Sequence, residues 1–435
     1  MSRYSSFCFE SYNFDAYSKT LTLNYSYENG PVFTETYRFD FEFTKHSHEA
    51  LDRALQLLFL IAGVSYFKIF LAPNIVVKNI NINSQTADFL NKTYQRGLGE
   101  FFYVNKLEPN YSISFPVNTE SLLNVLSIDG TGNLIGLGGG KDSLVTTELF
   151  RGQPGTHTWS LGHRPQLQPL VEAIGIPHLF VEREWDKQLL ELKNDPKTYN
   201  GHIPVSAIFA IVGTVVAILS GQRDVIVSNE SSANEPNLNY HGIEINHQYS
   251  KSLEFEQDFQ KILLANFGDS IRYFSALRPL SETYIVEIFS KVAFDKYKNV
   301  FSSCNRAFTS RSNRMFWCGK CPKCAFIFLA LTPHIDRSAL EKLFNNKNLL
   351  LDNNLEPTYR QLLGIEGDKP LDCVGEIKES RAAMQLAKAK YPELSKFEFE
   401  LPENYNYRTL SQHSMPEGAF ALLKQFIELN QLPTS

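Results

Sequence analysis

The segment with the most specific chemistry is a glycine-rich turn that follows the short apolar run at residues 133–137. Residues 136–143 spell Gly-Leu-Gly-Gly-Gly-Lys-Asp-Ser, and a helix-forming pattern follows over residues 144–150. Three consecutive glycines remove every side chain from a turn, so backbone N–H groups can close around an anion; these are Gly138, Gly139 and Gly140. A helix that begins directly after them adds a favourable dipole for phosphate.

Three polar residues after the glycines support binding of a nucleotide. Lys141 can neutralise phosphate charge, Ser143 can donate a hydrogen bond, and Asp142 suits a Mg²⁺ ion or the orientation of the nucleotide. A Walker P-loop requires Ser or Thr where Asp142 stands, and a dinucleotide fingerprint requires Gly or Ala where Lys141 stands. The non-functional alternative is a glycine-rich helix cap that binds no ligand. The order of strand, glycines, Lys-Asp-Ser and helix favours phosphate binding over that alternative.

A second group of residues has the spacing of metal ligands. Three of its four thiols are separated by two residues each, and the fourth lies further upstream: Cys304, Cys318, Cys321 and Cys324. Four thiolates suit tetrahedral zinc, and such a site is structural because no position is left open for water. An iron–sulfur cluster is the main alternative. The non-functional alternative is a set of buried cysteines that bind no metal.

Basic residues gather around these cysteines, and no Asp or Glu lies between Cys304 and Cys324. They are Arg306, Arg311, Arg314, Lys320 and Lys323. They either compensate the net negative charge of a zinc–thiolate centre or bind a diphosphate or released pyrophosphate. Arg306 and Arg314 are therefore candidates for substrate binding.

Strand and helix patterns alternate around the glycine turn. Apolar strand-like runs at residues 156–161, 178–181 and 224–228 are separated by longer stretches with helical patterns. This alternation predicts an α/β fold with a parallel sheet and helices on both faces. The glycine turn then lies at the carboxyl end of a strand, where open α/β sheets bind ligands.

We expect four regions along the chain, each with its own pattern. They are an α+β domain at 1–125, an α/β domain with the glycine turn at 126–303, a four-cysteine zinc element at 304–335 and a helical region at 336–435. In the first region, alternation around residues 21–25 and the turn at 28–30 predict a hairpin. The helices expected outside the α/β domain are 48–68, 86–97, 337–344, 376–389 and 417–429.

Composition excludes several classes of protein. Of the 435 residues, 43% are hydrophobic and 20% charged, as in folded globular proteins, and the net charge of −5 gives no basic field for nucleic acid. The uncharged stretch at residues 203–222 is interrupted by Pro204 and Gly213, so we expect a buried core helix and no membrane partner. The first residues lack a signal-peptide pattern, so we expect a cytoplasmic protein whose cysteines are thiols or metal ligands.

The glycine motif resembles that of a known superfamily. Residues 138–143 resemble the SGGxDS loop of PP-loop (HUP-like) ATP pyrophosphatases, with Gly138 in the place of the first Ser. That resemblance implies cleavage of ATP between the α and β phosphates and transfer of AMP to an oxygen of the substrate. Residues 279–280, Ser303-Cys304 and the cysteines after them resemble the 7-cyano-7-deazaguanine synthase branch, which implies structural zinc.

Further segments narrow the resemblance to one family. These segments are residues 60–68, 97–101 and 228–233. Together with the glycine and cysteine motifs, they resemble the bacterial UDP-N-acetylmuramoyl-L-alanyl-L-glutamate epimerases. The resemblance implies an isomerase of peptidoglycan precursor synthesis. It implies ATP- and Mg²⁺-dependent inversion of the terminal L-Glu of UDP-N-acetylmuramoyl-L-Ala-L-Glu to D-Glu, with release of AMP and diphosphate.

This reaction needs an acid/base group. A free carboxylate resists loss of its Cα proton, whereas adenylation removes that negative charge and makes the carbonyl an electron sink. The candidates are His202, His241, His247 and Lys251. For each histidine taken alone, a structural role is the alternative. Because they follow a strand in a polar loop, Asn229 and Glu230 are candidates for contact with substrate or Mg²⁺.

Two other functions stay open at this point. A nucleobase- or tRNA-modifying PP-loop enzyme would also adenylate its substrate, although the acidic net charge and the absence of an appended basic domain oppose it. A non-catalytic nucleotide-binding protein is the second alternative, and the Gly138 replacement favours it. Tyr66 and Lys68 are candidates to contact the UDP-muramoyl part of the substrate. Alternatively, they form a capped helix end whose Lys side chain reaches solvent.

Overall fold

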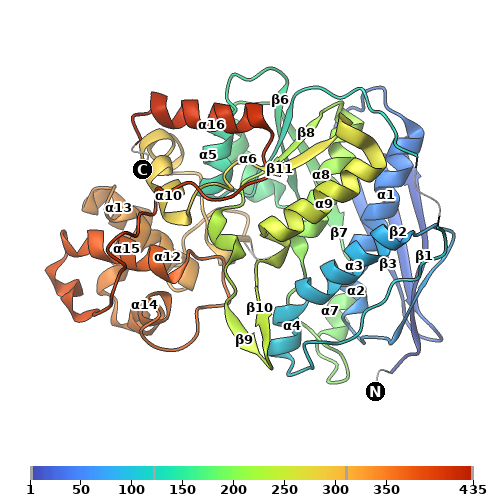
Figure 1. The fold of residues 1–435 in the computed structure, drawn as a ribbon, viewed down its shortest axis with the longest axis horizontal. Helices are drawn as coiled ribbons and strands as arrows, with labels where there is room; N and C mark the ends of the chain where they lie inside the picture. The colour runs from blue at the N-terminus through green and yellow to red at the C-terminus, as the bar shows by residue number, and fades with distance from the viewer. Residues whose placement is uncertain (1–2, 121–123, 309–311, 433–435) are drawn as a thin grey trace.

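A computed structural model describes residues 3–120, 124–308 and 312–432. Its centre is a nine-stranded sheet with the order β11-β8-β5-β6-β7-β3-β2-β1-β4 (Figure 1). The strands are β1 (Ser6–Asp15), β2 (Thr20–Tyr27), β3 (Val32–Asp40), β4 (Asn74–Val77), β5 (Asn133–Gly136), β6 (Thr156–Leu161), β7 (His178–Glu184), β8 (Asp224–Val227) and β11 (Arg272–Ser275). A separate hairpin is formed by β9 (Leu238–Tyr240) and β10 (Ile243–Ile245).

Helices cover both faces of this sheet and build the carboxyl-terminal third. Those up to the end of the α/β region are α1 (His48–Ala62), α2 (Val64–Phe67), α3 (Ser84–Gly97), α4 (Gly99–Val104), α5 (Lys141–Leu149), α6 (Arg164–Ile174), α7 (Gln188–Leu192), α8 (Val205–Ser220), α9 (Leu253–Phe267), α10 (Glu282–Val292) and α11 (Phe294–Tyr297). The rest are α12 (Pro322–Leu331), α13 (Arg337–Leu343), α14 (Glu356–Leu362), α15 (Ile377–Lys388) and α16 (Glu417–Leu429).

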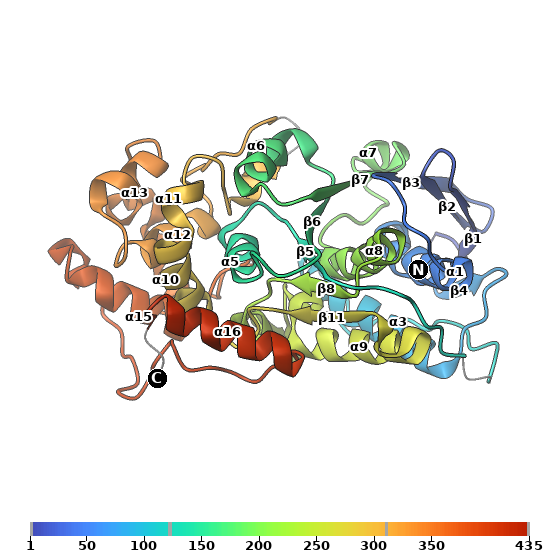
Figure 2. The same ribbon diagram turned by 90° about the horizontal axis from the view of Figure 1, so that it is seen from above.

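The five strands from β11 to β7 are parallel, as the alternation of strand and helix patterns predicts. Neighbouring residues of these strands belong to opposite cores because successive side chains point to opposite faces. Leu134 and Val225 join the core with α1, α8 and α9, whereas Ile135 and Ile226 join the core with α5, α10 and α12. The parallel sheet with helices on both faces is therefore confirmed (Figure 2).

The predicted amino-terminal hairpin is confirmed, and it extends the same sheet. β2 and β3 pair antiparallel, and β3 in turn pairs antiparallel with β7. This pairing continues to Glu184, three residues beyond the strand expected from sequence, because β3 supplies hydrogen bonds along the longer run. The sheet thus crosses residue 125, where we placed a domain boundary, and the four-region division stays a prediction.

Two apolar helices pack against one face of the sheet. α8 occupies the uncharged stretch, and 12 of its residues are buried, so the expected core helix is confirmed. The helix expected over 48–68 is divided at Gly63, where a Cβ atom would lie 2.4 Å from the Phe9 ring. Taken together, residues His48–Phe67 are long and apolar enough to cross a membrane, but 83% of the apolar 18-residue window within them is buried inside the protein.

The expected carboxyl-terminal helices are confirmed as α13, α15 and α16. α14 and α15 pack on α12, the helix that contains Cys324 and follows Cys321 directly, and α16 contacts α5. The chain between α14 and α15, residues 363–376, runs back to the carboxyl edge of the parallel strands, where Cys373 lines a cavity. The helical region therefore contributes directly to the candidate site.

A buried ion pair joins the amino-terminal strands to the parallel half of the sheet. Arg183 of β7 donates to Glu35 of β3 over 2.7 Å, and both side chains are almost fully buried. We expect Arg183→Ala to lower the free energy of unfolding by about 3 kcal/mol or more, because it leaves the Glu35 charge buried without its partner.

Urea unfolding measures this effect. Arg337→Ala is a matched control, since Arg337 is largely exposed in its pair with Glu341 and should cost less than about 1 kcal/mol. Equal losses for the two variants would contradict a special role for the buried pair.

Candidate active site

The glycine loop connects β5 to α5 at the carboxyl edge of the sheet. Gly139 has φ +81°, which favours glycine, and Gly140 is the residue that precedes the first turn of α5. A Cβ atom at Gly138 would meet no atom within 4 Å, so the backbone there borders open space. The helix begins at Lys141, three residues earlier than expected, and its first N–H groups therefore lie within the loop itself.

A cavity of about 490 Å³ adjoins this loop. It lies at the carboxyl ends of four parallel strands, β5, β6, β8 and β11, which is where open α/β sheets bind ligands. Its walls combine the glycine loop, the residues that follow β8, and two side chains from distant segments, Lys251 and Cys373. The volume falls in the range of small-molecule sites.

Lys141 is paired inside the protein, an arrangement that the sequence does not reveal. Its Nζ lies 3.1 Å from Glu282 Oε1 and also contacts Asp142, and the side chain is fully buried. Lys323 donates to the same Glu282 oxygen over 2.8 Å. Burial alone would raise the pKa of Glu282, but the two lysines lower it to about 2. Glu282 therefore stays ionised and fixes both cations beside the cavity, while direct neutralisation of phosphate by Lys141 stays a prediction.

The segment that follows β8 holds Asn229 and Glu230 in place. Asn229 lines the cavity, whereas Glu230 is buried, and its pKa is raised by that burial and by the nearby Glu282. Ser228 Oγ lies 2.7 Å from Thr146 Oγ1 of α5. This contact ties the segment to the helix that begins at the glycine loop. Contact of Asn229 and Glu230 with substrate or Mg²⁺ remains a prediction.

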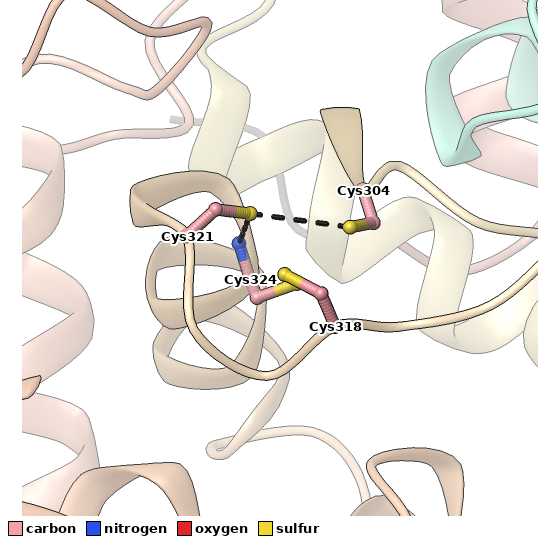
Figure 3. A group of neighbouring side chains, drawn as sticks. All are labelled: Cys304, Cys318, Cys321 and Cys324. Carbon is pink, nitrogen blue, oxygen red and sulfur yellow. Dashed lines mark hydrogen bonds between the residues drawn. The ribbon is translucent and has the colours of Figure 1, made fainter. Parts of the chain in front are cut away.

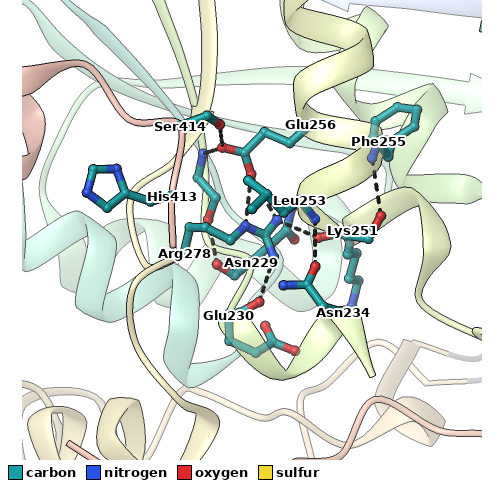
Figure 4. A network of polar contacts seen from close by, with 12 residues as sticks. Asn229, Glu230, Asn234, Lys251, Leu253, Phe255, Glu256, Arg278, His413 and Ser414 are labelled. Carbon is teal, nitrogen blue, oxygen red and sulfur yellow. Dashed lines mark hydrogen bonds and ion pairs between the residues drawn. The ribbon is translucent and has the colours of Figure 1, made fainter. Parts of the chain in front are cut away.

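Arg278 positions both ends of this segment, and sequence reasoning missed it. Its side chain is fully buried and pairs with Glu256, at 3.0 Å from Nε and 2.9 Å from Nη2 (Figure 4). The same guanidinium donates to the carbonyl of Glu230 over 2.6 Å and to that of Lys251 over 2.5 Å. One cation thus holds two parts of the cavity wall that lie 21 residues apart in sequence.

Three of the four acid/base candidates come together near the cavity. The rings of His202 and His247 lie 4.5 Å apart, and both adjoin Glu100. Lys251 lines the cavity. His241 does not join them, because it occupies the turn between β9 and β10 and lies, largely exposed, 3.5 Å from Glu108. This placement weighs against a catalytic role for His241.

The two clustered histidines differ in charge. Burial lowers the pKa of His202 to about 4, and the neighbouring His247 acts in the same direction. Burial would also lower the pKa of His247, but its hydrogen bonds with Cys373 and Glu100 raise it to about 10. At neutral pH the cluster therefore contains an imidazolium at His247 and a neutral ring at His202.

Two further members of this cluster were not singled out from the sequence as site residues. Glu100 lies in a segment that we quoted only for its family resemblance, and Cys373 lies in the helical region. Lys251 Nζ approaches Cys373 Sγ to 3.2 Å. The available signal was a sixth cysteine outside the four-cysteine motif, in the sequence Asp-Cys-Val-Gly-Glu.

The basic residues around the cysteines do not all lie on one exposed surface. Arg306, Arg314 and Lys320 are exposed, Lys323 is buried against Glu282, and Arg311 lies outside the described residues. Binding of diphosphate by Arg306 and Arg314 stays a prediction. Tyr66 is fully buried, and Lys68 Nζ donates to the carbonyl of Gly201 over 2.5 Å, so neither borders the cavity.

The four cysteines meet at one point, as expected (Figure 3). The Sγ atoms of Cys304 and Cys321 are 4.0 Å apart, and those of Cys318 and Cys324 are 3.7 Å apart. Zn–S bonds of about 2.3 Å place the sulfurs of a tetrahedral site about 3.8 Å apart, so the spacing fits zinc. The group can therefore hold a zinc ion with no ligand position left open.

The cysteine group also supports the glycine loop. Ser303, adjacent to Cys304, accepts a hydrogen bond from the backbone N–H of Lys141 over 3.3 Å. The N–H of Ser302 donates to the carbonyl of Gly139 over 3.1 Å. A metal ion bound to Cys304 would thereby restrain the backbone that borders the cavity.

Comparison with known proteins now gives the family. Residues 1–276 match the model of the MurL N-terminal domain, and residues 300–398 match that of the MurL C-terminal domain. The chain belongs to the MurL epimerase family. The chain is therefore an isomerase, and no solved structure matches it.

Relatives named UDP-N-acetyl-alpha-D-muramoyl-L-alanyl-L-glutamate epimerase cover most of the chain. The protein of Xanthomonas oryzae pv. oryzae is 39% identical over 390 residues, with 88% of this chain and 85% of the relative covered. That of Salinispora tropica is 36% identical over 402 residues, with the same two shares. That of a Micromonospora species is 38% identical over 340 residues, with 77% and 75% covered.

Metal content tests the cysteine group. We expect the purified protein to carry one zinc per chain by elemental analysis, and Cys324→Ala to lose it and to melt at a lower temperature, because a structural metal contributes to folding. Cys8→Ala is the matched control, since Cys8 is a buried cysteine of β1 away from the group. Iron in place of zinc would contradict this assignment.

Proposed function

We propose that this chain uses ATP to invert the terminal L-Glu of UDP-N-acetylmuramoyl-L-Ala-L-Glu in the cytoplasm, as a step of peptidoglycan precursor synthesis. The relatives bear the name of this epimerase. One observation supports the mechanism: a single cavity is lined both by the glycine loop, which has the features of a phosphate-binding loop, and by titratable side chains. Activation of a carboxylate and proton transfer at the adjacent carbon require both in one place.

The glycine loop would bind the phosphates of ATP. Backbone N–H groups at the start of α5 and the open face at Gly138 suit a polyphosphate. Ser143 lines the cavity beside them, and the paired cations of Lys141 and Lys323 lie behind them. Asp142 would hold Mg²⁺, which neutralises phosphate charge when bound. Gly139 and Gly140 let the loop backbone pack closely, because a Cβ atom at Gly139 would meet Met315 and one at Gly140 would meet Ser303 Oγ.

Activation changes the acidity of the substrate. In the activation step, the substrate carboxylate attacks the α phosphate of ATP. This attack forms an acyl adenylate and releases diphosphate. The adenylate carries no carboxylate charge, so its carbonyl accepts the electron pair left when the Cα proton departs. Return of a proton to the opposite face gives D-Glu, and hydrolysis releases AMP.

Side chains around the cavity would orient the substrate for these steps. Asn229 lines the cavity and can donate to a substrate oxygen, and Glu230 lies buried beside it. Lys251 lines the same wall, and the His202–His247 pair lies behind it, where His247 hydrogen-bonds to Cys373; these groups would supply the acid and the base. Arg306 and Arg314 would meet the diphosphate of the UDP part or the released diphosphate. Structural zinc at the four cysteines would fix the backbone behind the glycine loop.

An incubation in D₂O with ATP, Mg²⁺ and the UDP-muramoyl dipeptide tests this function. We expect AMP, diphosphate and D-Glu with deuterium at Cα, because activation precedes proton exchange. Asp142→Asn should lower AMP formation at least about a hundredfold, since it removes the charge proposed to hold the metal. Asp295→Asn, at a highly exposed carboxylate, is the matched control and should leave the rate unchanged.

Each other outcome has a distinct meaning. Folded wild-type protein that forms neither AMP nor D-Glu would contradict the proposed function. AMP without inversion would keep adenylation but point to another acceptor. Unchanged turnover in Asp142→Asn would contradict the role of the glycine loop.

A further inference from the structure

Cys373 is brought to the cavity by a loop with several anchors. The carboxylate of Asp372 accepts the backbone N–H of Cys373 over 2.8 Å and also contacts Asn305, next to the cysteine group. Lys369, four residues earlier, pairs with Glu235 of the segment after β8 over 2.6 Å. The loop is thus tied to both other walls of the cavity, which fixes the position of the thiol.

A chain of polar contacts ends on this thiol. Glu100 hydrogen-bonds to Nδ1 of His247, and the side chain of His247 hydrogen-bonds to Cys373. From another side, Lys251 Nζ lies 3.2 Å from Cys373 Sγ. A carboxylate that orients a histidine, and a histidine that contacts a thiol, are the arrangement that activates sulfur. The carbonyl of Lys251 is held by Arg278, and the ammonium also lies 3.5 Å from Gln248 Oε1.

The charges around Cys373 favour the thiolate. Burial alone would raise its pKa, but the ammonium of Lys251 and the imidazolium of His247 lower it to about 7, with Lys323 acting in the same direction. The other titratable groups around this cluster are Glu100, His202, Glu230, Asp142 and Asp372. Despite these carboxylates, the two charged groups that hydrogen-bond to the sulfur are cations, so much of the thiol is ionised near pH 7.

The cavity holds a separate sign of a ligand. Trp159 of β6 lines it and is 3% exposed, and its indole Nε1 has no hydrogen-bond acceptor among the described residues. A buried donor without a partner costs free energy that a bound polar group can recover. Trp159 pairs with Gly136 of β5, so this donor lies in the wall beside the glycine loop.

We propose that the Cys373 thiolate is the base that removes the Cα proton of the activated glutamate. This assignment rests on the proposed function. The Cα–H bond breaks and an S–H bond forms, while the electron pair of the C–H bond moves into the carbonyl of the acyl adenylate. An acid that exchanges with solvent then protonates the opposite face, and the Cys373 thiol returns its proton to water before the next turnover. No oxidant or other co-reactant is required.

Two half-reactions measured on the same full-length variants test this role. Cys373→Ala should keep substrate-dependent exchange of labelled diphosphate into ATP within about threefold of wild type, because activation does not use the thiol. Its incorporation of deuterium at Cα should fall at least about a hundredfold, the usual contribution of a positioned base. Cys8→Ala should match wild type in both assays, since Cys8 lies in β1.

The outcomes separate this proposal from the function on which it rests. Wild-type protein without diphosphate exchange overturns the proposed function. Cys373→Ala with a normal rate of Cα exchange overturns the role of the thiol and leaves the function standing. Loss of both half-reactions in a variant with the wild-type circular dichroism spectrum also overturns it, because the thiol would then serve activation.

Alkylation tests the ionisation of the thiol while Cys373 itself stays in place. Iodoacetamide should modify Cys373 with a midpoint near pH 7, as located by mass spectrometry, and the substrate should protect it. His247→Gln should move that midpoint upward, since it removes a cation beside the sulfur. A midpoint near the ordinary thiol value of about 8.5, unmoved by His247→Gln, would contradict an activated thiolate.

Discussion

Arg278 is the constraint on which the candidate site depends. A guanidinium removed from water must be matched by a carboxylate and by hydrogen-bond acceptors, and here Glu256 and two backbone carbonyls satisfy it. Those carbonyls belong to Glu230 and Lys251, so one buried cation sets where both residues stand. Glu256 in turn accepts from Ser275 N and Ser414 Oγ, which joins β11 and the last segment of the chain to the same centre.

A second buried charge cluster does the same for the glycine loop. Glu282 at the start of α10 holds Lys141 and Lys323, and Lys323 lies between two of the four cysteines. Ser303, beside Cys304, accepts from the backbone of the loop. The glycine loop, the four-cysteine group and the cavity are therefore connected to one another. A structural zinc at the cysteines would limit the motion of the glycine-loop backbone.

Features set by neighbouring residues were predictable from the sequence, and contacts across long separations were not. The hairpin, the parallel strands, the glycine turn and the four-cysteine group follow from local periodicity or spacing. Glu100 meets His247 across 147 residues, and Lys251 meets Cys373 across 122, and no local pattern encodes either contact. His241 and His247 are six residues apart, yet His241 lies in the exposed β9–β10 turn, whereas His247 contacts Cys373 and Glu100.

The central claim is that one cavity both activates the glutamate and exchanges its Cα proton. A crystal structure with a non-hydrolysable glutamyl-adenylate analogue tests it most directly. Our account predicts that the phosphate mimic contacts the backbone of Gly138–Gly140 and that the glutamyl Cα faces Cys373 on the same cavity. An analogue bound with its Cα turned away from Cys373 and Lys251, or seated outside this cavity, would contradict the account.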